Sequence, residues 1–127
     1  MGRTALVTGG TGGLGSAVTT ALLADGWRVV VPWIAEEELS RVEQVDGLEL
    51  VRADLFSAED TARCADVAAG DQDAPLRAVV NLVGGFAMGP KVHEAPVEEF
   101  EAQLRLNLRP TYLTCQAAVP HLIDGGG

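Results

Sequence analysis

The feature that most constrains the fold of this chain is a glycine-rich run near its N-terminus, TGGTGGLG at residues 8–15. The run follows apolar residues 5–7, and within and after it Leu14, Val18 and Leu22 recur at helical spacing. Glycine loses more conformational freedom on folding than any other residue, so five glycines within eight residues indicate a turn that side chains would obstruct. The pattern predicts a strand, a tight glycine turn and a helix, in that order.

The same alternation of apolar runs and helical segments continues along the chain. Further strands are predicted at 28–31, 48–51 and 76–82, and helices at 36–45, from 57 to about 70, and from Pro96 onward. Strands that are apolar nearly throughout and are separated by helices pair in parallel, with helices on both faces of the sheet. We therefore predict an α/β fold with a doubly wound parallel sheet of about four strands, forming one domain over residues 1–127.

The last predicted helix carries apolar residues on roughly one face, and these are Phe100, Leu104, Leu108, Cys115 and Val119. We expect this face to pack on the sheet. The strand at 76–82 would then be an edge strand with apolar residues on both faces. Such an edge promotes aggregation unless another chain or segment covers it.

The net charge of the chain limits the classes of partner that it can bind. Eighteen acidic residues face nine basic ones, a net charge of −9, which disfavours binding to nucleic acid or to an anionic membrane. No run approaches the ~20 apolar residues that span a bilayer, and the N-terminus shows no signal-peptide pattern, so we expect a cytoplasmic protein. We expect no metal site, because no close-spaced ligands accompany Cys64, Cys115, His93 or His121.

The predicted glycine turn is placed to bind a phosphate group. The first amides of a helix lack hydrogen-bond partners and carry the positive end of the helix dipole. We predict that Gly9 permits a tight exit from the strand, that Gly13 lets a pyrophosphate approach the backbone, and that Gly15 allows close packing of helix on strand. The Thr11 hydroxyl would either cap the helix or contact a phosphate.

Two glycine patterns overlap here, Gly10-x-Gly12-x-x-Gly15 and the narrower Thr8-Gly9-x-x-x-Gly13-Leu14-Gly15. The narrower pattern resembles that of the short-chain dehydrogenase/reductase family, whose fold is Rossmann-like. Three later features extend the resemblance over nearly the whole chain: Asp54-Leu55 after the third strand, Asn81-Leu82-Val83-Gly84 after the fourth, and Asn107 in the long helix.

The resemblance implies an NAD(P)-dependent oxidoreductase that transfers hydride to or from a carbonyl or alcohol substrate. This chain would supply the dinucleotide seat through Gly9, Thr11, Gly13, Leu14, Gly15, Trp33, Asp54, Leu55, Asn81, Val83 and Gly84. The resemblance also implies that Asn107 is the asparagine of the catalytic tetrad, organising a water toward a lysine. Simpler roles stay open: Asp54 as a helix-capping acid, Trp33 as an exposed or core aromatic, and both asparagines as satisfied buried polar groups.

The family's catalytic serine and Tyr-x-x-x-Lys motif do not match any residues of this sequence. Tyr112 has Gln116 at the fourth position after it, and Lys91 lies upstream in a loop. We expect Tyr112 to be a packed helix residue and the 127-residue chain alone to be inactive. Completion would come from a homo-oligomer or a complementing C-terminal segment. The alternatives are a non-catalytic module that binds a dinucleotide or a partner, and a truncated fragment.

The residues that choose between NAD and NADP usually follow the second strand, where an acid receives the ribose 2′-hydroxyl or a base receives a 2′-phosphate. Here Trp33 and Ile34 are neither acid nor base, and Gly12 is also neutral. Glu36 lies close enough in sequence to swing in and repel a 2′-phosphate. The cofactor is therefore NAD or NADP, and the sequence favours NAD.

Overall fold

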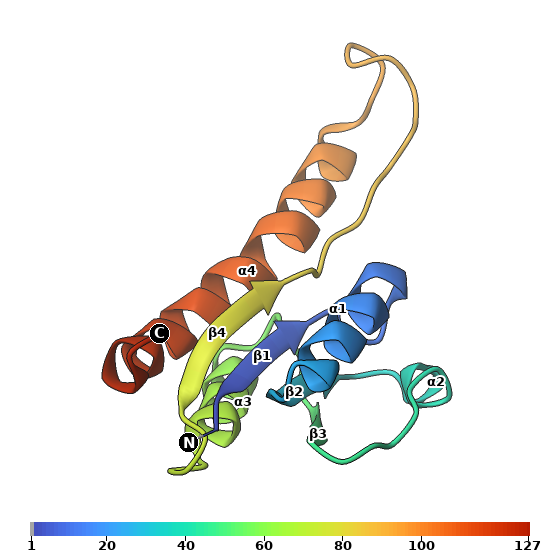
Figure 1. Ribbon diagram of the computed structural model, residues 1–127. Helices are drawn as coiled ribbons and strands as arrows, with labels where there is room; N and C mark the ends of the chain where they lie inside the picture. The colour runs from blue at the N-terminus through green and yellow to red at the C-terminus, as the bar shows by residue number, and fades with distance from the viewer. Residues whose placement is uncertain (1) are drawn as a thin grey trace.

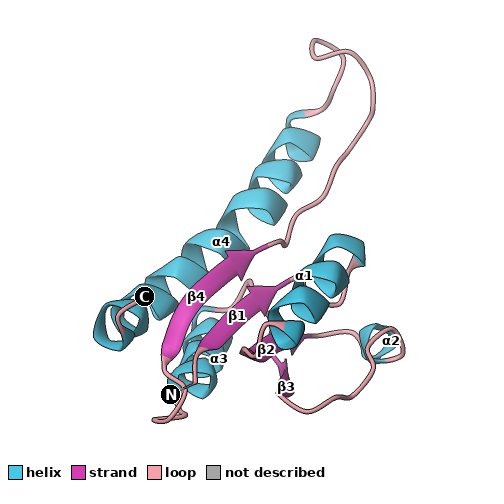
Figure 2. Ribbon diagram, viewed as in Figure 1, coloured by secondary structure: helices cyan, strands magenta, loops and turns pink. Residues whose placement is uncertain are grey.

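The computed structural model describes residues 2–127 and arranges them as a parallel sheet with helices on both faces (Figures 1 and 2). In chain order the elements are β1 (Thr4–Thr8), α1 (Gly13–Ala24), β2 (Arg28–Trp33), α2 (Glu36–Leu39), β3 (Leu48–Arg52), α3 (Ala58–Ala69), β4 (Leu76–Asn81) and α4 (Val97–Gly125). The strand order is β3-β2-β1-β4, and all three pairings are parallel. The predicted α/β fold with a doubly wound sheet is confirmed.

The central strands β1 and β2 are buried on both faces along most of their length, which explains why they read as apolar runs. Successive side chains of a strand point to opposite faces. Leu6 and Val30 pack against α3 and α4 on one side, whereas Val7 and Val29 pack against α1 on the other. The apolar residues of these central strands therefore contribute to both layers of the core.

Cys64 of α3 belongs to the first of these core layers and is 1% exposed. Burial raises the pKa of its thiol to about 11, so the reactive thiolate is scarce at neutral pH. Cys115 of α4 is only half-buried. Both cysteines are free.

We expect Cys64 to react with a thiol reagent such as DTNB only after the protein unfolds. The sharpest measurement uses a Cys115→Ser variant, in which Cys64 is the one remaining thiol. This variant should show no fast labelling in buffer and one labelled thiol in denaturant. Fast labelling without denaturant would contradict the packing described for α3.

Helix α2 is much shorter than predicted, because the expected helix at 36–45 ends at Leu39. The Ser40 hydroxyl donates to the carbonyl oxygen of Glu37 at 2.7 Å, a local bond that competes with helix propagation. Val42 and Val45 then follow in irregular backbone up to Gly47, whose φ of +88° favours glycine. Helical periodicity alone overestimated this segment.

The predicted packing face of α4 is wrong. Phe100 and Leu108 are 62% and 59% exposed, and Leu104 and Val119 are exposed as well. The face that packs on β4 and α3 instead carries Pro110, Leu113, Thr114 and Ala118. These mostly smaller residues let the helix approach the sheet closely. A prediction from helical periodicity relies on the large apolar side chains and therefore chose the other face.

The N-terminal half of α4 extends past the ends of the strands, together with the loop that precedes it (Figure 1). This overhang explains why Phe100, Leu104 and Leu108 stay exposed within residues 2–127. Tyr112 is 66% exposed, so the expectation that it packs in the helix interface is also wrong. Within residues 2–127 no helix combines the length and the apolar character needed to cross a membrane.

Candidate functional site

The predicted site residues of the first half of the chain gather at the carboxyl ends of the strands. The order of the strands switches sides at β1, because β2 and β3 lie on one side of β1 and β4 lies on the other. In doubly wound sheets, ligands bind at such a switch point, in the crevice beyond the strand ends. The glycine turn leaves β1 at this place, with Gly9 at φ +71°.

The turn delivers unpaired amides to the start of α1. Gly12 donates its amide to the Gly9 carbonyl oxygen at 3.1 Å, and Ser16 donates to the Gly12 carbonyl oxygen at 2.8 Å. The intervening amides of Gly13, Leu14 and Gly15 have no backbone acceptor within the described residues. Thr11 does not cap the helix, since Gly12 occupies the N-cap position without a side-chain bond.

The glycines of the turn differ sharply in the space around them. A Cβ added at Gly15 would lie 1.9 Å from the Gly9 carbonyl oxygen and 2.7 Å from the Gly10 Cα. Helix α1 can therefore sit on the turn only because residue 15 has no side chain. A Cβ at Gly13 would meet nothing within 4 Å, so the backbone there faces open space. Leu14 beside it is 69% exposed.

A cavity of about 180 Å³ lies beside the turn, between the ends of β2 and β3 and the segment after β4. It brings together five residues that were predicted to contact a cofactor: Gly9, Trp33, Asp54, Leu55 and Val83. It is also lined by Pro32, Ile34, Glu38, Ala53 and Phe56, which sequence reasoning did not select. Segments separated by more than half the chain thus form one small pocket next to the free amides.

Asp54 has a structural bond in this pocket. One of its carboxylate oxygens accepts the Phe56 amide at 2.9 Å, closing a turn that leads into α3. The cap of α3 is Ser57, whose hydroxyl oxygen accepts the Asp60 amide at 3.2 Å. The alternative that Asp54 caps the helix is therefore wrong, and its side chain remains exposed at the pocket.

Glu38 is a polar residue of the pocket that the sequence did not single out. The sequence had indicated Glu36 as the acid close to the cofactor. The Glu38 carboxylate accepts three hydrogen bonds: from the Thr11 hydroxyl at 2.7 Å, the Ala35 amide at 2.8 Å and the Ile34 amide at 2.9 Å. Partial burial raises the pKa of Glu38, but these bonds and the charge of Arg41 outweigh it and hold the pKa below its ordinary value. An acid three residues after the N-cap of a helix is the available signal.

The asparagines lie on the other side of β4, against α4. Asn81 donates from Nδ2 to the Cys115 sulfur at 3.5 Å, while its Oδ1 is buried without a partner among the described residues. Asn107 is exposed, accepts the Gly85 amide at 3.0 Å and donates to the Gln103 carbonyl oxygen at 2.9 Å. A Cβ at Gly84 would come within 2.8 Å of the Asn107 oxygen, so Asn107 holds the segment after β4 tightly.

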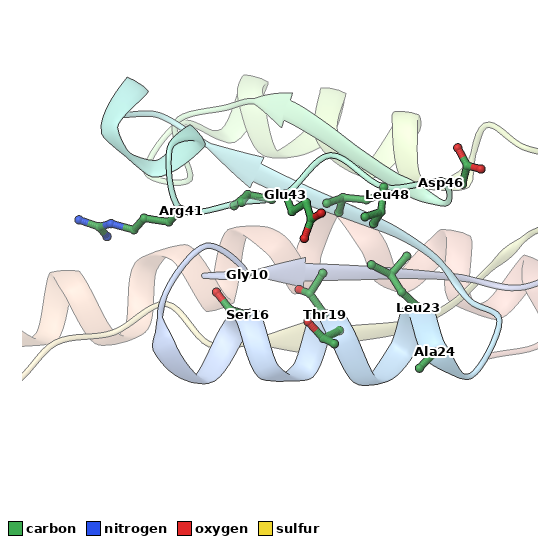
Figure 3. A pocket seen from close by; sticks show the side chains of 12 residues that line it. Gly10, Ser16, Thr19, Leu23, Ala24, Arg41, Glu43, Asp46 and Leu48 are labelled. Carbon is green, nitrogen blue, oxygen red and sulfur yellow. The ribbon is translucent and has the colours of Figure 1, made fainter.

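A second, larger cavity of about 580 Å³ opens between α1 and the segment 41–48 (Figure 3). It contains none of the predicted site residues, and one of its walls is the irregular backbone at residues 41–46 that follows α2. Ser16 and Thr19 line one side and Glu43 the other, while Arg41 extends away from it (Figure 3). Within residues 2–127 no cluster of three or more His, Cys, Asp or Glu residues is suited to hold a metal ion.

Comparison with known proteins gives consistent matches. A family model described as short chain dehydrogenase matches residues 3–127. The 2-(R)-hydroxypropyl-CoM dehydrogenase of Xanthobacter autotrophicus is 33% identical over 136 residues, covering 100% of this chain and 54% of that protein. The solved structure of a short-chain type dehydrogenase/reductase from Mycobacterium ulcerans has a TM-score of 0.85 at 26% identity, covering 98% of this chain and 48% of that one.

A second solved structure shows the fold alone, since its identity to this chain is low. The solved structure of ElxO with NADP bound is 19% identical, with a TM-score of 0.86 and coverage of 98% of this chain and 52% of that one. In each comparison this chain is matched nearly end to end. It spans about half the length of the curated relatives it matches.

Proposed function

This chain belongs to the short-chain dehydrogenase family, and from that premise we propose that it supplies the dinucleotide seat of an NAD(P)-dependent oxidoreductase. The observation that carries the proposal is the start of α1, where three successive amides lack backbone acceptors and the backbone at Gly13 faces open space. A diphosphate fits such a place because it supplies acceptor oxygens and negative charge to the positive end of the helix dipole.

The neighbouring residues suit the rest of the dinucleotide. Trp33, Leu55 and Val83 give the 180 Å³ pocket apolar walls for the adenine ring, and Asp54 adds a polar acceptor at its edge. On the other side of the turn, Asn81 and Gly84 would border the second ribose, and the orphaned Asn81 Oδ1 is an acceptor ready for a donor. The residues present therefore fit the cofactor that the family implies.

When bound, a nicotinamide dinucleotide supplies hydride transfer to or from a carbonyl or alcohol carbon. We assign Asn107 a place beside that chemistry, because it fixes the Gly85 backbone at the edge of the seat. Its amide nitrogen is already engaged by Gln103 within its own helix. We propose that Asn107 positions the segment after β4 and, as the tetrad asparagine, takes part in a proton relay completed by residues outside this sequence.

We further propose that the cofactor is NAD and that the site is completed by a second copy or a complementing C-terminal segment. Unpartnered apolar side chains line α4, and β4 pairs on one side only within residues 2–127. A covering segment would shield these apolar side chains from water and pair with the free edge of β4. Location in the cytoplasm stays a prediction.

Tryptophan fluorescence tests the seat with a control inside the chain. Trp33 lines the pocket at the end of β2, whereas Trp27 precedes β2 at the opposite end, roughly 20 Å away. Trp27 instead packs under the Arg3 guanidinium, 4.4 Å from its ring centroid. ADP-ribose, which carries the adenosine and diphosphate without nicotinamide, should therefore change the emission of Trp33 alone.

The expected result is a saturable change in emission that Trp27→Phe retains and Trp33→Phe removes. Calorimetry on Trp33→Phe separates loss of signal from loss of binding. A response that follows Trp27, or no saturable binding at all, would refute the proposed seat.

A further inference from the structure

We propose that Glu38 is the residue that makes this seat select NAD over NADP, by accepting a hydroxyl of the adenosine ribose where NADP carries its 2′-phosphate. This inference rests on the proposed function and goes further than it by assigning the discrimination to one carboxylate. The strand end where an acid is usual holds Trp33 and Ile34 instead. Glu38 comes from α2, five residues after Trp33.

The position of the Glu38 carboxylate is fixed by its contacts. Helix α2 begins at Glu36, so residue 38 lies in its first turn, and the side chain bends back onto the amides that precede the helix. Its other oxygen accepts the hydroxyl of Thr11, a residue of the glycine turn itself. The carboxylate is thereby held in the pocket wall, at a set place relative to the amides that would bind the diphosphate.

The carboxylate has capacity for one further donor. An ionised carboxylate offers about four acceptor positions, and three are used here by Thr11, Ile34 and Ala35. Because an ionised carboxylate can only accept hydrogen bonds, the remaining position also needs a donor. A ribose hydroxyl supplies one, whereas a 2′-phosphate supplies only acceptor oxygens and negative charge.

The charges around the pocket also disfavour a 2′-phosphate. Its lining contains two carboxylates, Glu38 and Asp54, and no Lys or Arg among the described residues. The bonds that lower the pKa of Glu38 keep it ionised at neutral pH. Three arginines lie near the pocket without lining it: the charge of Arg41 acts on Glu38, and Arg105 and Arg109 contact Phe56 in the pocket wall. Arg41 lines the larger cavity and extends away from it (Figure 3). The pocket lining itself therefore holds no cation that would offset a phosphate dianion.

Calorimetry with a pair of probes tests this assignment: ADP-ribose and ADP-ribose carrying a 2′-phosphate, at one fixed salt concentration. We expect the wild-type chain to prefer ADP-ribose by at least about tenfold, as one close like-charge contact and one lost hydrogen bond require. Glu38→Gln keeps the size of the side chain and removes its charge. It should lower that preference by about tenfold.

Glu37→Gln is the matched control, because it makes the same charge change one residue away on the same helix with an exposed side chain. Its preference should equal that of the wild type. If Glu38→Gln binds ADP-ribose but keeps the wild-type preference, or if Glu37→Gln changes the preference as much, the assignment to Glu38 is overturned while the seat stands. If wild type binds neither probe, the proposed function fails, and this inference fails with it.

Discussion

A Gly13→Val variant is expected to lose ADP-ribose binding by at least about a hundredfold while remaining folded. A Cβ at this position meets no atom within 4 Å, so the protein itself has room for the side chain. The space that it fills is the space that a diphosphate needs to reach the amides of Gly13, Leu14 and Gly15. Helix propensity does not oppose the change, since valine is no worse than glycine in a helix.

Isothermal calorimetry measures the affinity, and circular dichroism reports the fold. Ala17→Val is the matched control, because it adds a β-branched side chain one turn along α1 at an exposed position. This control should bind ADP-ribose as the wild type does. An unchanged affinity in Gly13→Val would mean that the diphosphate, if it binds, does not sit on the first turn of α1.

A Gly15→Ala variant is expected to lose about 3 kcal/mol or more of unfolding free energy. The added methyl group would lie 1.9 Å from the Gly9 carbonyl oxygen and 2.7 Å from the Gly10 Cα, and these backbone atoms cannot rotate away. Either α1 or the turn must shift. Gly9 has little room to move, because a Cβ built on it would lie 2.9 Å from the backbone of Leu82, just after β4. The loss should lower the unfolding temperature by about 10 °C or more.

Gly13→Ala is the comparison for stability, since it adds the same methyl group two residues earlier in the same helix. It should be neutral or stabilising by up to about 1 kcal/mol. Recovery of folded Gly13→Ala together with failure to obtain folded Gly15→Ala would also bear out the expectation. Equal unfolding temperatures for the two variants would contradict the close contact between α1 and the glycine turn.

The sequence was sufficient wherever the structure follows from local signals. Apolar runs such as residues 29–31 became strands because burial on both faces of the sheet favours apolar side chains. The glycine run became a turn because φ at Gly9 and the contact at Gly15 exclude side chains. Residues as distant as Gly9 and Asp54 line one pocket because parallel strands end at the same edge of a sheet.

The sequence was insufficient wherever tertiary packing decided between faces or partners. Phe100 and Leu108 have the spacing of a core stripe, but the sheet is covered by the smaller residues of α4 around Ala118. Glu36 and Glu38 both lie in the first turn of α2, and they are separated by the bonds that the Glu38 carboxylate accepts from the Thr11 hydroxyl and from the amides of Ile34 and Ala35. The periodicity of a sequence does not predict where hydrogen-bond donors from different elements meet in space.

The measurement that bears most directly on the seat is an amide NMR titration of the ¹⁵N-labelled chain with ADP-ribose. If the first turn of α1 holds the diphosphate, the largest shifts at saturation belong to the amides of Gly13, Leu14 and Gly15, with smaller shifts at Trp33 and Leu55 around the pocket. Saturating shifts confined to the larger cavity between α1 and residues 41–48, with those three amides unmoved, would contradict it.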